Sequence, residues 1–294
     1  MIAIKRTLGF INNHPLAKKH LLLAYFNLVK WQINSRIYKG LIKVPFVNDV
    51  SFYARKRLTG ITGNIYTGLH EFNDMGFVLH FLKEGDVFYD VGANVGSYTL
   101  LASGVTKATT LAFEPINSTF EILSKNIELN ELSNLVELVN KGVGKTAEIL
   151  LFSTTDDTTN HVIIEEENID GQGIEVINLD YFEDKYSPAL IKIDVEGYEL
   201  EVLDGANKTL INPELKAIII EIIGGSNLYG HDMDSIHKKL ISFNFKPYSY
   251  NPFTRVLEPA LPYIESNTIY IRDIDFVTKR VSSAKSFYVF KEYV

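Results

Sequence analysis

The chain has 294 residues, 46% of them hydrophobic and 12% aromatic, which is enough apolar material for a large core without covalent cross-links. It contains no cysteine, which excludes disulfides, thiolate metal sites and cysteine nucleophiles. The formal net charge of −7, taken over the whole chain, argues against a nucleic acid or another anionic partner.

This charge is divided unevenly along the chain. Residues 1–60 hold eleven basic side chains and a single acidic one, Asp49, so this segment carries +10 and the remainder −17. An asymmetry of this kind indicates a separate surface interaction for the basic part. We therefore expect a basic N-terminal extension over residues 1–60, made of a helix and short strands, followed by one domain over residues 61–294.

The longest apolar stretch of the extension runs from Leu21 to Val29. It is too short for a membrane span, which needs roughly 18 or more apolar residues. Lys30 follows it, and not the small residues of a secretory cleavage site. We interpret the stretch as a helix, with Trp31 at its margin, that either packs on the domain or lies on a membrane surface. The basic charge favours a cytoplasmic chain whose extension approaches the anionic inner face of a membrane.

From about residue 60 onwards, short apolar strands alternate with helical segments. Strands are predicted at Val87–Val91, Thr109–Phe113, Leu135–Val139, Ala189–Ile193 and Lys216–Ile222. Helices are predicted at His70–Lys83, Ile116–Leu129 and Met233–Ile241. This alternation is typical of an α/β fold with a parallel sheet and ligands at the carboxyl ends of its strands. Two later segments, Phe245–Tyr250 and Asn267–Arg272, are expected to pair antiparallel at one edge of the sheet.

The most informative motif follows the first of these strands and reads D-V-G-A-N-V-G-S, from Asp90 to Ser97. Gly92 permits a tight turn and Gly96 lets the next helix pack closely, because neither carries a Cβ atom. A dinucleotide fingerprint has glycine where Asn94 stands here. Asp90 would repel phosphates but would pair with the ammonium group of a ligand. The turn therefore favours a nucleoside joined to an amino acid.

Glu114 ends the second strand, where a carboxylate can accept hydrogen bonds from both hydroxyls of a ribose. The alternative is an acid at the start of a helix, ahead of Pro115, that interacts with the helix dipole. The ordered set of strand, glycine turn, helix, strand and glutamate indicates a cofactor site more specifically than any one of these elements alone. The residues expected to bind a cofactor are Asp90, Gly92, Asn94, Gly96, Ser97, Glu114, Pro115 and Asp194.

With these residues the chain resembles the class I S-adenosylmethionine-dependent methyltransferases, and within them the FkbM family. The matching blocks are Asp90 to Gly96, Phe113 to Pro115, Leu190 to Glu199, Val202 to Ala206 and Glu221, within about residues 64–275. The resemblance implies a Rossmann-like, seven-stranded, mostly parallel sheet with helices on both faces and an antiparallel last strand. It also implies S-adenosylmethionine as cofactor and methyl transfer to a hydroxyl oxygen, commonly of a sugar, a glycan or a secondary metabolite.

The block from Leu190 to Glu199 carries the candidate catalytic residues. Lys192 and Asp194 lie two apart and so share one face of a strand, while Asp194 and Glu196 bracket its end. Because the attacking hydroxyl loses its proton, a base near the methyl group would assist. Asp194 is our first candidate for that base or for holding the acceptor, and Lys192 is the second. The alternative is an ion pair of Lys192 with Glu196 or Glu199 that only shapes the loop.

A metal-assisted reaction is a further alternative. Asp180, Asp194 and Glu221 could approach one another at strand ends, and carboxylate oxygens suit Mg²⁺. Paired carboxylates in a cleft are more often hydrogen-bonded than metal-bound.

The segment from Gly142 to Thr146 ends like a phosphate-binding loop. A phosphate-binding loop is followed by a helix, but the residues after this segment have the pattern of a strand, so we interpret the segment as a turn. The residue that contacts adenine is left unassigned.

The acceptor is expected to be a small molecule or a glycan and not a nucleic acid. Its selection is expected to rest on residues 153–175, which include His161, on residues 226–232 and on the extension. Two other functions are kept as alternatives. One is a nicotinamide-dependent oxidoreductase, which Asn94 and Asp90 disfavour, and the other is a non-catalytic binding protein that retains the cleft.

Overall fold

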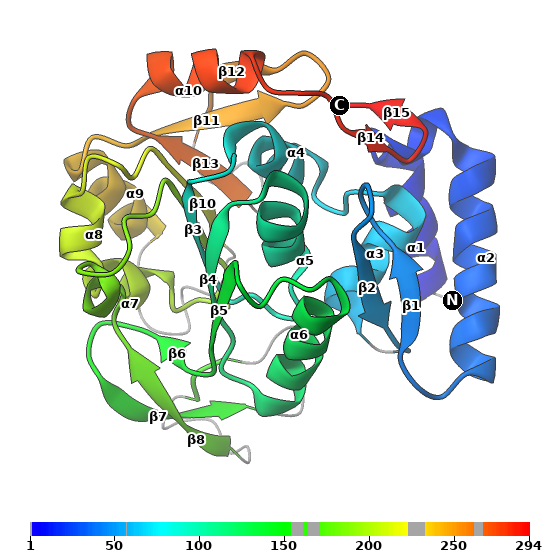
Figure 1. Cartoon of the computed structure of the whole chain (residues 1–294), viewed down its shortest axis with the longest axis horizontal. Coiled ribbons are helices and arrows are strands. Elements are labelled where there is room, and N and C mark those ends of the chain that lie inside the picture. Colours follow the sequence, from blue (N-terminus) through cyan, green and yellow to red (C-terminus); the bar gives the residue numbers. More distant parts are fainter. Residues whose placement is uncertain (1, 57, 154–160, 164–170, 223–232, 262–266) are drawn as a thin grey trace.

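The computed structural model describes residues 2–56, 58–153, 161–163, 171–222, 233–261 and 267–294 (Figure 1). A mixed sheet of eight strands lies at its centre. Across the sheet the order is β12 (Val256–Pro259), β11 (Lys246–Asn251), β13 (Asn267–Ile271), β10 (Ala217–Glu221), β9 (Leu190–Ile193), β3 (Val87–Val91), β4 (Thr109–Phe113) and β5 (Val136–Val139). The five strands from β10 to β5 are parallel, and β13 is antiparallel to both of its neighbours.

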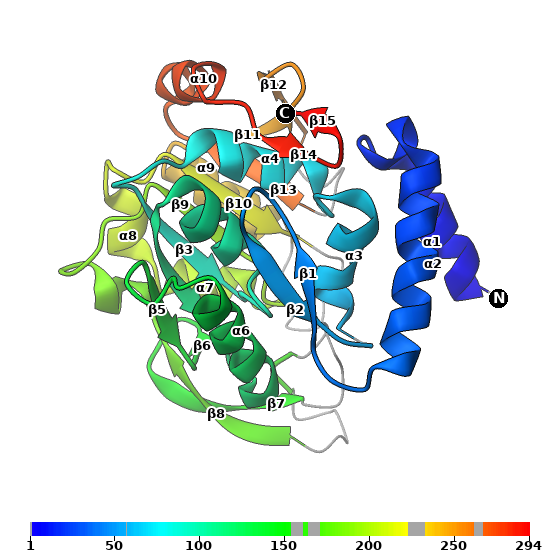
Figure 2. The same ribbon diagram turned by 45° about the vertical axis from the view of Figure 1, so that its right-hand side comes forward.

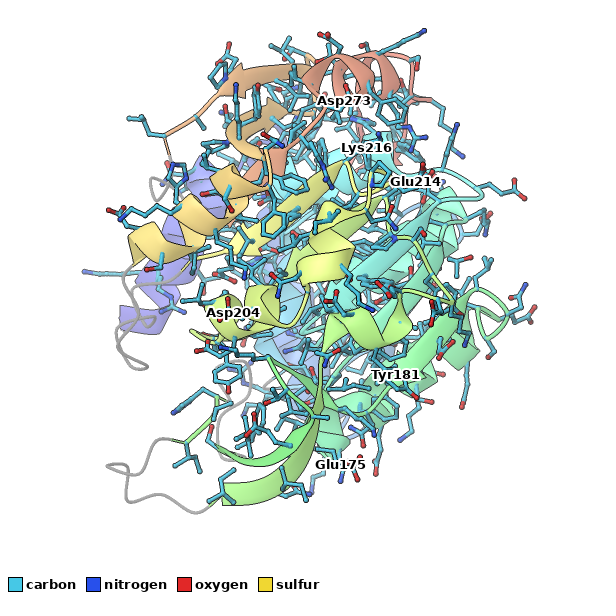
Figure 3. The ribbon with its side chains drawn as sticks, turned by 90° about the vertical axis from the view of Figure 1, so that its left-hand side faces the viewer. Glu175, Tyr181, Asp204, Glu214, Lys216 and Asp273 are labelled. Carbon is cyan, nitrogen blue, oxygen red and sulfur yellow. The ribbon has the colours of Figure 1, made fainter. Side chains whose placement is uncertain are left out.

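This arrangement confirms the predicted α/β fold and the antiparallel strands at one edge. The seven implied strands are all present, and β12 adds an eighth at the outside of β11. The extra strand forms because the chain turns back at Asn251, whose Oδ1 accepts hydrogen bonds from the backbone N–H groups of Phe253 and Thr254. At the amino end of β10, Lys216 pairs with Asp273, which follows β13, at 3.8 Å (Figure 3).

Helices cover both faces of the sheet because successive strand residues point to opposite sides. Phe88 of β3 belongs to one buried cluster, whereas Tyr89 and Val91 belong to the other. The first cluster includes residues of α4 (Phe72–Phe81), the π-helix η2 (Leu100–Thr106), α6 (Asn117–Leu129) and α10 (Ile274–Ser282). The second includes residues of η3 (Leu179–Phe182), α7 (Glu199–Asp204), α8 (Asn207–Ile211) and α9 (Met233–Ser242).

A smaller sheet lies beyond β5, where the chain between β5 and β9 leaves the main sheet. It consists of β6 (Gly142–Val143), β8 (Gly171–Ile177) and β7 (Glu148–Ser153), in that order. The turn and the strand predicted after Gly142 are therefore observed. Lys145, in the turn, is largely exposed and lies 3.4 Å from Asp204.

The N-terminal segment is helical at first and then forms a hairpin. Its elements are α1 (Ile2–Asn13), η1 (Ala17–Lys19), α2 (Leu21–Ile37), β1 (Ile42–Pro45) and β2 (Ser51–Ala54). The predicted helix at Leu21–Val29 thus continues to Ile37. Within the described ranges, no helix has the length and apolar composition needed to cross a membrane.

This segment packs on the rest of the chain at several points. Asn27 of α2 donates a hydrogen bond to the carbonyl of Ile65 in α3 (Thr59–Thr67), and the backbone N–H of Tyr53 donates to Asn126 of α6. Figure 2 shows α1 and α2 together at one side of the molecule, beside α3. The C-terminal hairpin of β14 (Tyr288–Val289) and β15 (Glu292–Tyr293) contacts the N-terminal segment at η1, where Lys19 pairs with Glu292 at 3.1 Å. The division at residue 60 stays a prediction.

Candidate active site

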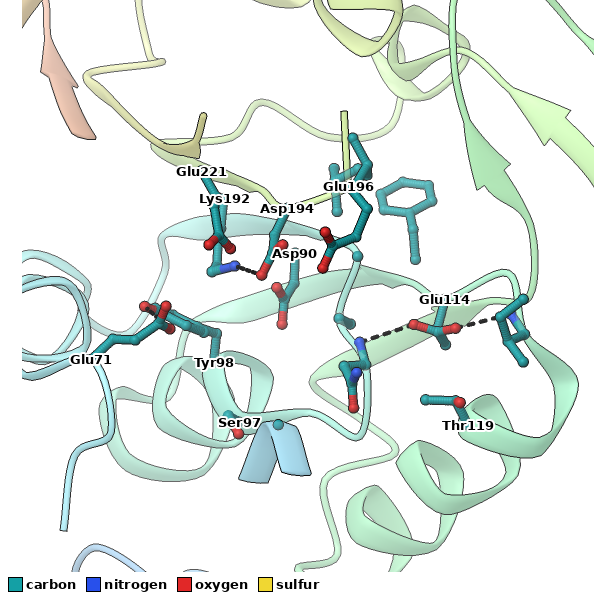
Figure 4. A pocket seen from close by; sticks show the side chains of 18 of the residues that line it. Glu71, Asp90, Ser97, Tyr98, Glu114, Thr119, Lys192, Asp194, Glu196 and Glu221 are labelled. Carbon is teal, nitrogen blue, oxygen red and sulfur yellow. Dashed lines mark hydrogen bonds and ion pairs between the residues drawn. The ribbon is translucent and has the colours of Figure 1, made fainter. Parts of the chain in front are cut away.

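A pocket with a volume of about 570 Å³ opens at the carboxyl ends of β3, β4, β9 and β10 (Figure 4). This volume is typical of a small-molecule site. Seven of the eight predicted cofactor residues line it, all except Gly96, and so do Lys192, Glu196 and Glu221. One wall comes from the N-terminal segment, through Arg6, Thr7 and Phe10 of α1. The pocket therefore combines the extension with the strand ends of the sheet.

The turn after β3 has a backbone that only certain residues tolerate. Gly92 has a φ of 80°, and a Cβ atom there would lie 1.8 Å from the carbonyl oxygen of Asp194. Asn94 has a φ of 50°, a left-handed conformation that asparagine adopts more easily than most residues. Its Oδ1 accepts a hydrogen bond from the N–H of Val95 at 2.7 Å. Gly96, with a φ of 97°, lies against Leu123 of α6 and precedes the short helix α5 (Ser97–Thr99).

Asp90 lies at the end of β3, beside Lys192 of β9 in the parallel register. Its side chain is buried and accepts a hydrogen bond from the hydroxyl of Thr99 at 2.6 Å. Burial raises the pKa of Asp90 to about 6, although Lys192 and Thr99 oppose this shift. Asp90 thus adds negative charge to the floor of the pocket near neutral pH.

Glu114 joins the turn after β3 to the start of α6. It accepts hydrogen bonds from the backbone N–H of Asn94 at 3.0 Å and from that of Ile116, the N-cap of α6, at 2.9 Å (Figure 4). Burial raises the pKa of Glu114 to about 7, while these two bonds lower it. The carboxylate therefore holds the start of a helix and also lines the pocket, and its role toward a ribose stays a prediction.

Lys192, Asp194 and Glu221 form a connected group at the ends of β9 and β10. The Nζ of Lys192 lies 2.6 Å from Oδ2 of Asp194, and Asp194 shares a side-chain hydrogen bond with Glu221. Lys192 is only 2% exposed. Lys192 therefore forms an ion pair, as the alternative interpretation expected, but its partner is Asp194 and not Glu196 or Glu199.

The charges of this group follow from its contacts. Burial alone would lower the pKa of Lys192, but the charge of Asp194 and of other nearby carboxylates outweighs it and raises that pKa. Burial opposes ionisation of Asp194, yet Lys192 lowers its pKa overall. Burial and the charge of Asp194 raise the pKa of Glu221 to about 9. Near neutral pH the group consists of a lysine cation, an aspartate anion and a protonated glutamic acid.

Glu196 faces the same pocket from the turn after β9. It has a φ of 51° and precedes Gly197, whose φ is 100°, so two left-handed residues follow one another. Burial and the neighbouring Asp194 raise the pKa of Glu196 to about 7. Glu199 is buried and accepts a hydrogen bond from the N–H of Gly197 at 2.9 Å. Glu199 therefore stabilises the turn, which presents Glu196 to the pocket in a conformation that costs energy.

The structure does not bring together Asp180, Asp194 and Glu221, the set considered as an alternative metal site, because Asp180 lies elsewhere. Its carboxylate accepts hydrogen bonds from the backbone N–H groups of Lys208 and Thr209 at 2.9 Å each, at the start of α8. A carboxylate in this position caps a helix. In the part of the chain that the structure describes, no three His, Asp or Glu side chains come together to hold a metal ion.

Glu71 and Tyr98 are among the pocket residues that were not predicted from the sequence. Glu71 accepts hydrogen bonds from the hydroxyl of Tyr98 at 2.8 Å and from the amide of Asn267 at 2.7 Å. The ring of Tyr98 lies 4.8 Å from the Nζ of Lys192. Tyr98 directly follows Ser97 of the glycine motif, which was a usable signal. Glu71 precedes α4, and no local pattern distinguishes it.

Of the segments expected to select the acceptor, the extension is described, whereas much of 153–175 and all of 226–232 lie outside the described residues. The residues of these two segments that lie outside are 154–160, 164–170 and 226–232. The backbone N–H of His161 donates to Oγ of Ser153 at 3.0 Å.

Comparison with known proteins gives one family and several relatives. The family described as "Methyltransferase FkbM domain" matches residues 90–247. The hexuronic acid methyltransferase AglP of Haloferax volcanii is 29% identical over 192 residues, which cover 63% of this chain and 77% of that protein.

Solved structures that match parts of the chain include methyltransferases. The methyltransferase FkbM of Methylobacillus flagellatus KT matches with a TM-score of 0.46 and 15% identity, over 83% of this chain and 58% of that one. A putative methyltransferase of Streptococcus mutans in complex with SAH matches with a TM-score of 0.41 and 13% identity, over 67% of this chain and 93% of that one. The chain thus spans somewhat more than half the length of the FkbM structure.

Proposed function

The chain belongs to the FkbM methyltransferase family, and from this premise we propose that it transfers the methyl group of S-adenosylmethionine to a hydroxyl oxygen of a sugar or glycan. The observation that carries the proposal is the charge of the pocket. Its acidic lining residues are Glu71, Asp90, Glu114, Asp194, Glu196 and Glu221, and its lysine and arginine residues are Arg6, Lys141 and Lys192. S-adenosylmethionine bears a sulfonium, an ammonium and a carboxylate group and is a net cation. A pocket with more acidic than basic side chains therefore complements it, even though Glu221 is protonated near neutral pH.

We propose a placement for the nucleoside along the pocket. We assign the ribose hydroxyls to Glu114, whose carboxylate keeps acceptor positions free beyond its two backbone bonds. The adenine ring would lie at the apolar end between Ile116 and Val143, with Phe152 behind it, all three of which line the pocket. A Cβ atom at Gly142 would lie 3.0 Å from the ring of Phe152, so glycine lets that ring pack closely at this end of the pocket. This assigns the adenine contact that the sequence left open.

The amino-acid part of the cofactor would lie toward Asp90 and Asp194, beside the turn from Gly92 to Ser97. When bound, S-adenosylmethionine supplies an electrophilic methyl group that leaves with a neutral thioether behind it. The carboxylates that surround this region favour the cation of the bound state, and the loss of the sulfonium charge on reaction lowers the affinity for the product relative to the reactant.

The acceptor hydroxyl must lose its proton as its oxygen bonds to the methyl carbon. We assign that proton to Glu196, because a pKa of about 7 is well matched to general base catalysis near neutral pH. Asp194, kept ionised by Lys192, would accept a hydrogen bond from the same hydroxyl and orient it. Lys192 remains protonated and cannot act as the base, so its role is to position Asp194. Asp194 is thus retained as the residue that holds the acceptor.

The relative that acts on a hexuronic acid supports a sugar as the class of acceptor. The first test is isothermal titration of the chain with S-adenosylhomocysteine and, separately, with NAD. We expect binding of S-adenosylhomocysteine and none of NAD, and binding of NAD alone would contradict the proposal. The second test is methyl transfer to a panel of hexuronic acids and neutral sugars. Cofactor binding without turnover of any acceptor would favour a non-catalytic protein that retains the cleft.

A further inference from the structure

Helix α2 exposes a continuous row of large apolar side chains. Its members are Leu22, Phe26, Val29, Ile33 and Ile37, each between 52% and 89% exposed. They are spaced four, three, four and four residues apart, which places them on one face of the helix. We call this row the α2 stripe. Figure 1 shows α2 at the margin of the molecule, where the outer face of the helix meets solvent.

The opposite face of α2 already satisfies the packing of the domain. Ala24, Trp31 and Ser35 are buried there, and Ala24 belongs to a small core with Ile11 of α1. A helix on the surface of a globular protein normally turns polar residues outward once its inner face is covered. An apolar row on the outer face as well is therefore not needed for folding, and contiguous exposed apolar surface of this kind marks an interaction site.

Cations border the stripe on both sides. At 100° per residue, Lys30 and Arg36 fall on opposite flanks of the row, and both are exposed. Lys18 and Lys39 are exposed beyond the two ends of the helix. In the sequence no acidic residue precedes Asp49, so no carboxylate of this segment neutralises these charges. A helix with an apolar face bordered by lysine and arginine is the pattern of a segment that lies in the interface of an anionic bilayer.

We propose that the α2 stripe docks on the surface of an anionic lipid bilayer. The five apolar side chains enter the boundary between headgroups and acyl chains, while Lys30 and Arg36 reach the lipid phosphates. A second copy of the chain would cover the stripe less well, because two segments of charge +10 would then face each other and repel. An anionic bilayer accommodates both the apolar row and the cations beside it.

Docking in this orientation would hold the pocket close to the membrane. Phe10 of α1 packs on the small core beneath α2 and also lines the pocket. The same helix thus connects the docking face with the site. This consequence rests on the proposed function, whereas the docking itself does not.

The test uses the full chain and large unilamellar vesicles of phosphatidylcholine, with and without phosphatidylglycerol. Phe26→Glu with Ile33→Glu places charge in the stripe, and Ile149→Glu with Leu151→Glu is the matched control on β7, where both side chains are 55% or more exposed. We expect the unmodified chain to sediment with the anionic vesicles. The stripe variant should lose at least about tenfold in partition coefficient and the control should lose none, because apolar burial supplies much of the binding.

A second measurement does not depend on a disruptive substitution. The chain has no cysteine, so Leu22→Cys can be labelled specifically with an environment-sensitive fluorophore, with Ile149→Cys as control. A blue shift at residue 22 alone on addition of anionic vesicles is the expected result. Absence of that shift together with absence of sedimentation would overturn the proposal. So would a dimer seen by light scattering that the stripe variant converts to monomer, since a second copy would then occupy the stripe.

Discussion

The charged groups of the pocket and those of helix α2 lie in opposite environments. In the pocket, Lys192 is 2% exposed and its charge is balanced by Asp194 at 2.6 Å. On α2, Lys30 and Arg36 are exposed and lie beside apolar side chains that are exposed too. Burial shifts the pKa values of the pocket groups and limits the screening of their charges by salt. The cations of α2 are in contact with solvent, so they can attract an external anionic partner but are screened by salt. A net charge of −7 describes neither region.

The largest effect should come from removing the orienting carboxylate. Asp194→Asn should lower kcat by about 10²–10⁴-fold, because the variant cannot accept the hydroxyl hydrogen bond as an anion and leaves Lys192 buried without its partner. Steady-state methyl transfer measures this loss, with titration of S-adenosylhomocysteine to show that the cofactor still binds. Asp180→Asn is the control, and its kcat should not change if Asp180 only caps α8. An unchanged kcat for Asp194→Asn would remove this residue from the reaction.

The next largest effect concerns the base. For the unmodified chain, kcat/KM should rise with pH through an apparent pKa near 7 as Glu196 loses its proton. Glu196→Gln should lower kcat by about 10²-fold and abolish that inflection. Glu114 has a pKa of about 7 as well, so Glu114→Gln is the matched control. It should raise the KM for the cofactor and keep the inflection, and the reverse pattern would exchange the two roles.

The tight turn after β3 predicts that a side chain at position 92 destabilises the fold. Gly92→Ala should lower the free energy of unfolding by about 2 kcal/mol or more, because the new Cβ atom would collide with the main chain of Asp194 at a left-handed φ. Urea denaturation measures the change. Gly173→Ala on β8 is the control, since the added atom there makes only an ordinary contact with Ile149 at 3.4 Å. Equal losses in the two variants would argue against a specific clash.

The buried acid pair predicts how stability depends on pH. The pKa of Glu221 is raised from 4.5 to about 9 in the folded chain, so its contribution is full below 4.5 and is lost as the pH rises toward 9. Asp194, with a lowered pKa, loses its contribution in the opposite direction, as the pH falls through that pKa. Glu221→Gln should therefore flatten the decline of the unfolding free energy between about pH 5 and pH 9. A decline of unchanged slope in urea titrations would contradict this assignment.

The smallest effect is the response of the pocket to salt. Raising the ionic strength should change the Kd for S-adenosylhomocysteine by less than about twofold, because buried charges are screened little. Binding of the chain to anionic vesicles should weaken steeply over the same range, because exposed cations attract the lipids. If binding of S-adenosylhomocysteine and binding of anionic vesicles depended equally on salt, the pocket and α2 would not differ in how far solvent screens their charges.

Much of the sheet could be predicted because its strands are short apolar runs between glycine, proline and polar turns. β3 and β4 begin and end at the predicted residues. The turn from Gly92 to Gly96 was recognisable because a left-handed backbone and a close approach of Asp194 restrict which residues can stand there. Glu114 was recognisable because it ends a strand whose neighbour carries that turn.

Other features depend on contacts between segments that are distant in the sequence. Asp180 was grouped with Asp194 because both are acids near strand ends, but its hydrogen bonds to α8 direct it elsewhere. The pairing of Lys192 with Asp194, and not with Glu196 or Glu199, depended on side-chain directions at the strand end. Glu71 precedes α4, and its partners Tyr98 and Asn267 of β13 come from segments that are distant in the sequence.

The sequence by itself determined the alternation of strands and helices, the glycine turn, the acidic strand ends and the basic extension, because each is a local pattern of residue types. Only the tertiary structure decided which of the many carboxylates meet, since that depends on how β3, β9 and β10 lie side by side. It also decided that the apolar residues of α2 point both inward and outward. The apolar positions in the sequence show which residues of α2 could be buried. The packing of α1 and α3 covers only one side of α2 and leaves the α2 stripe in solvent.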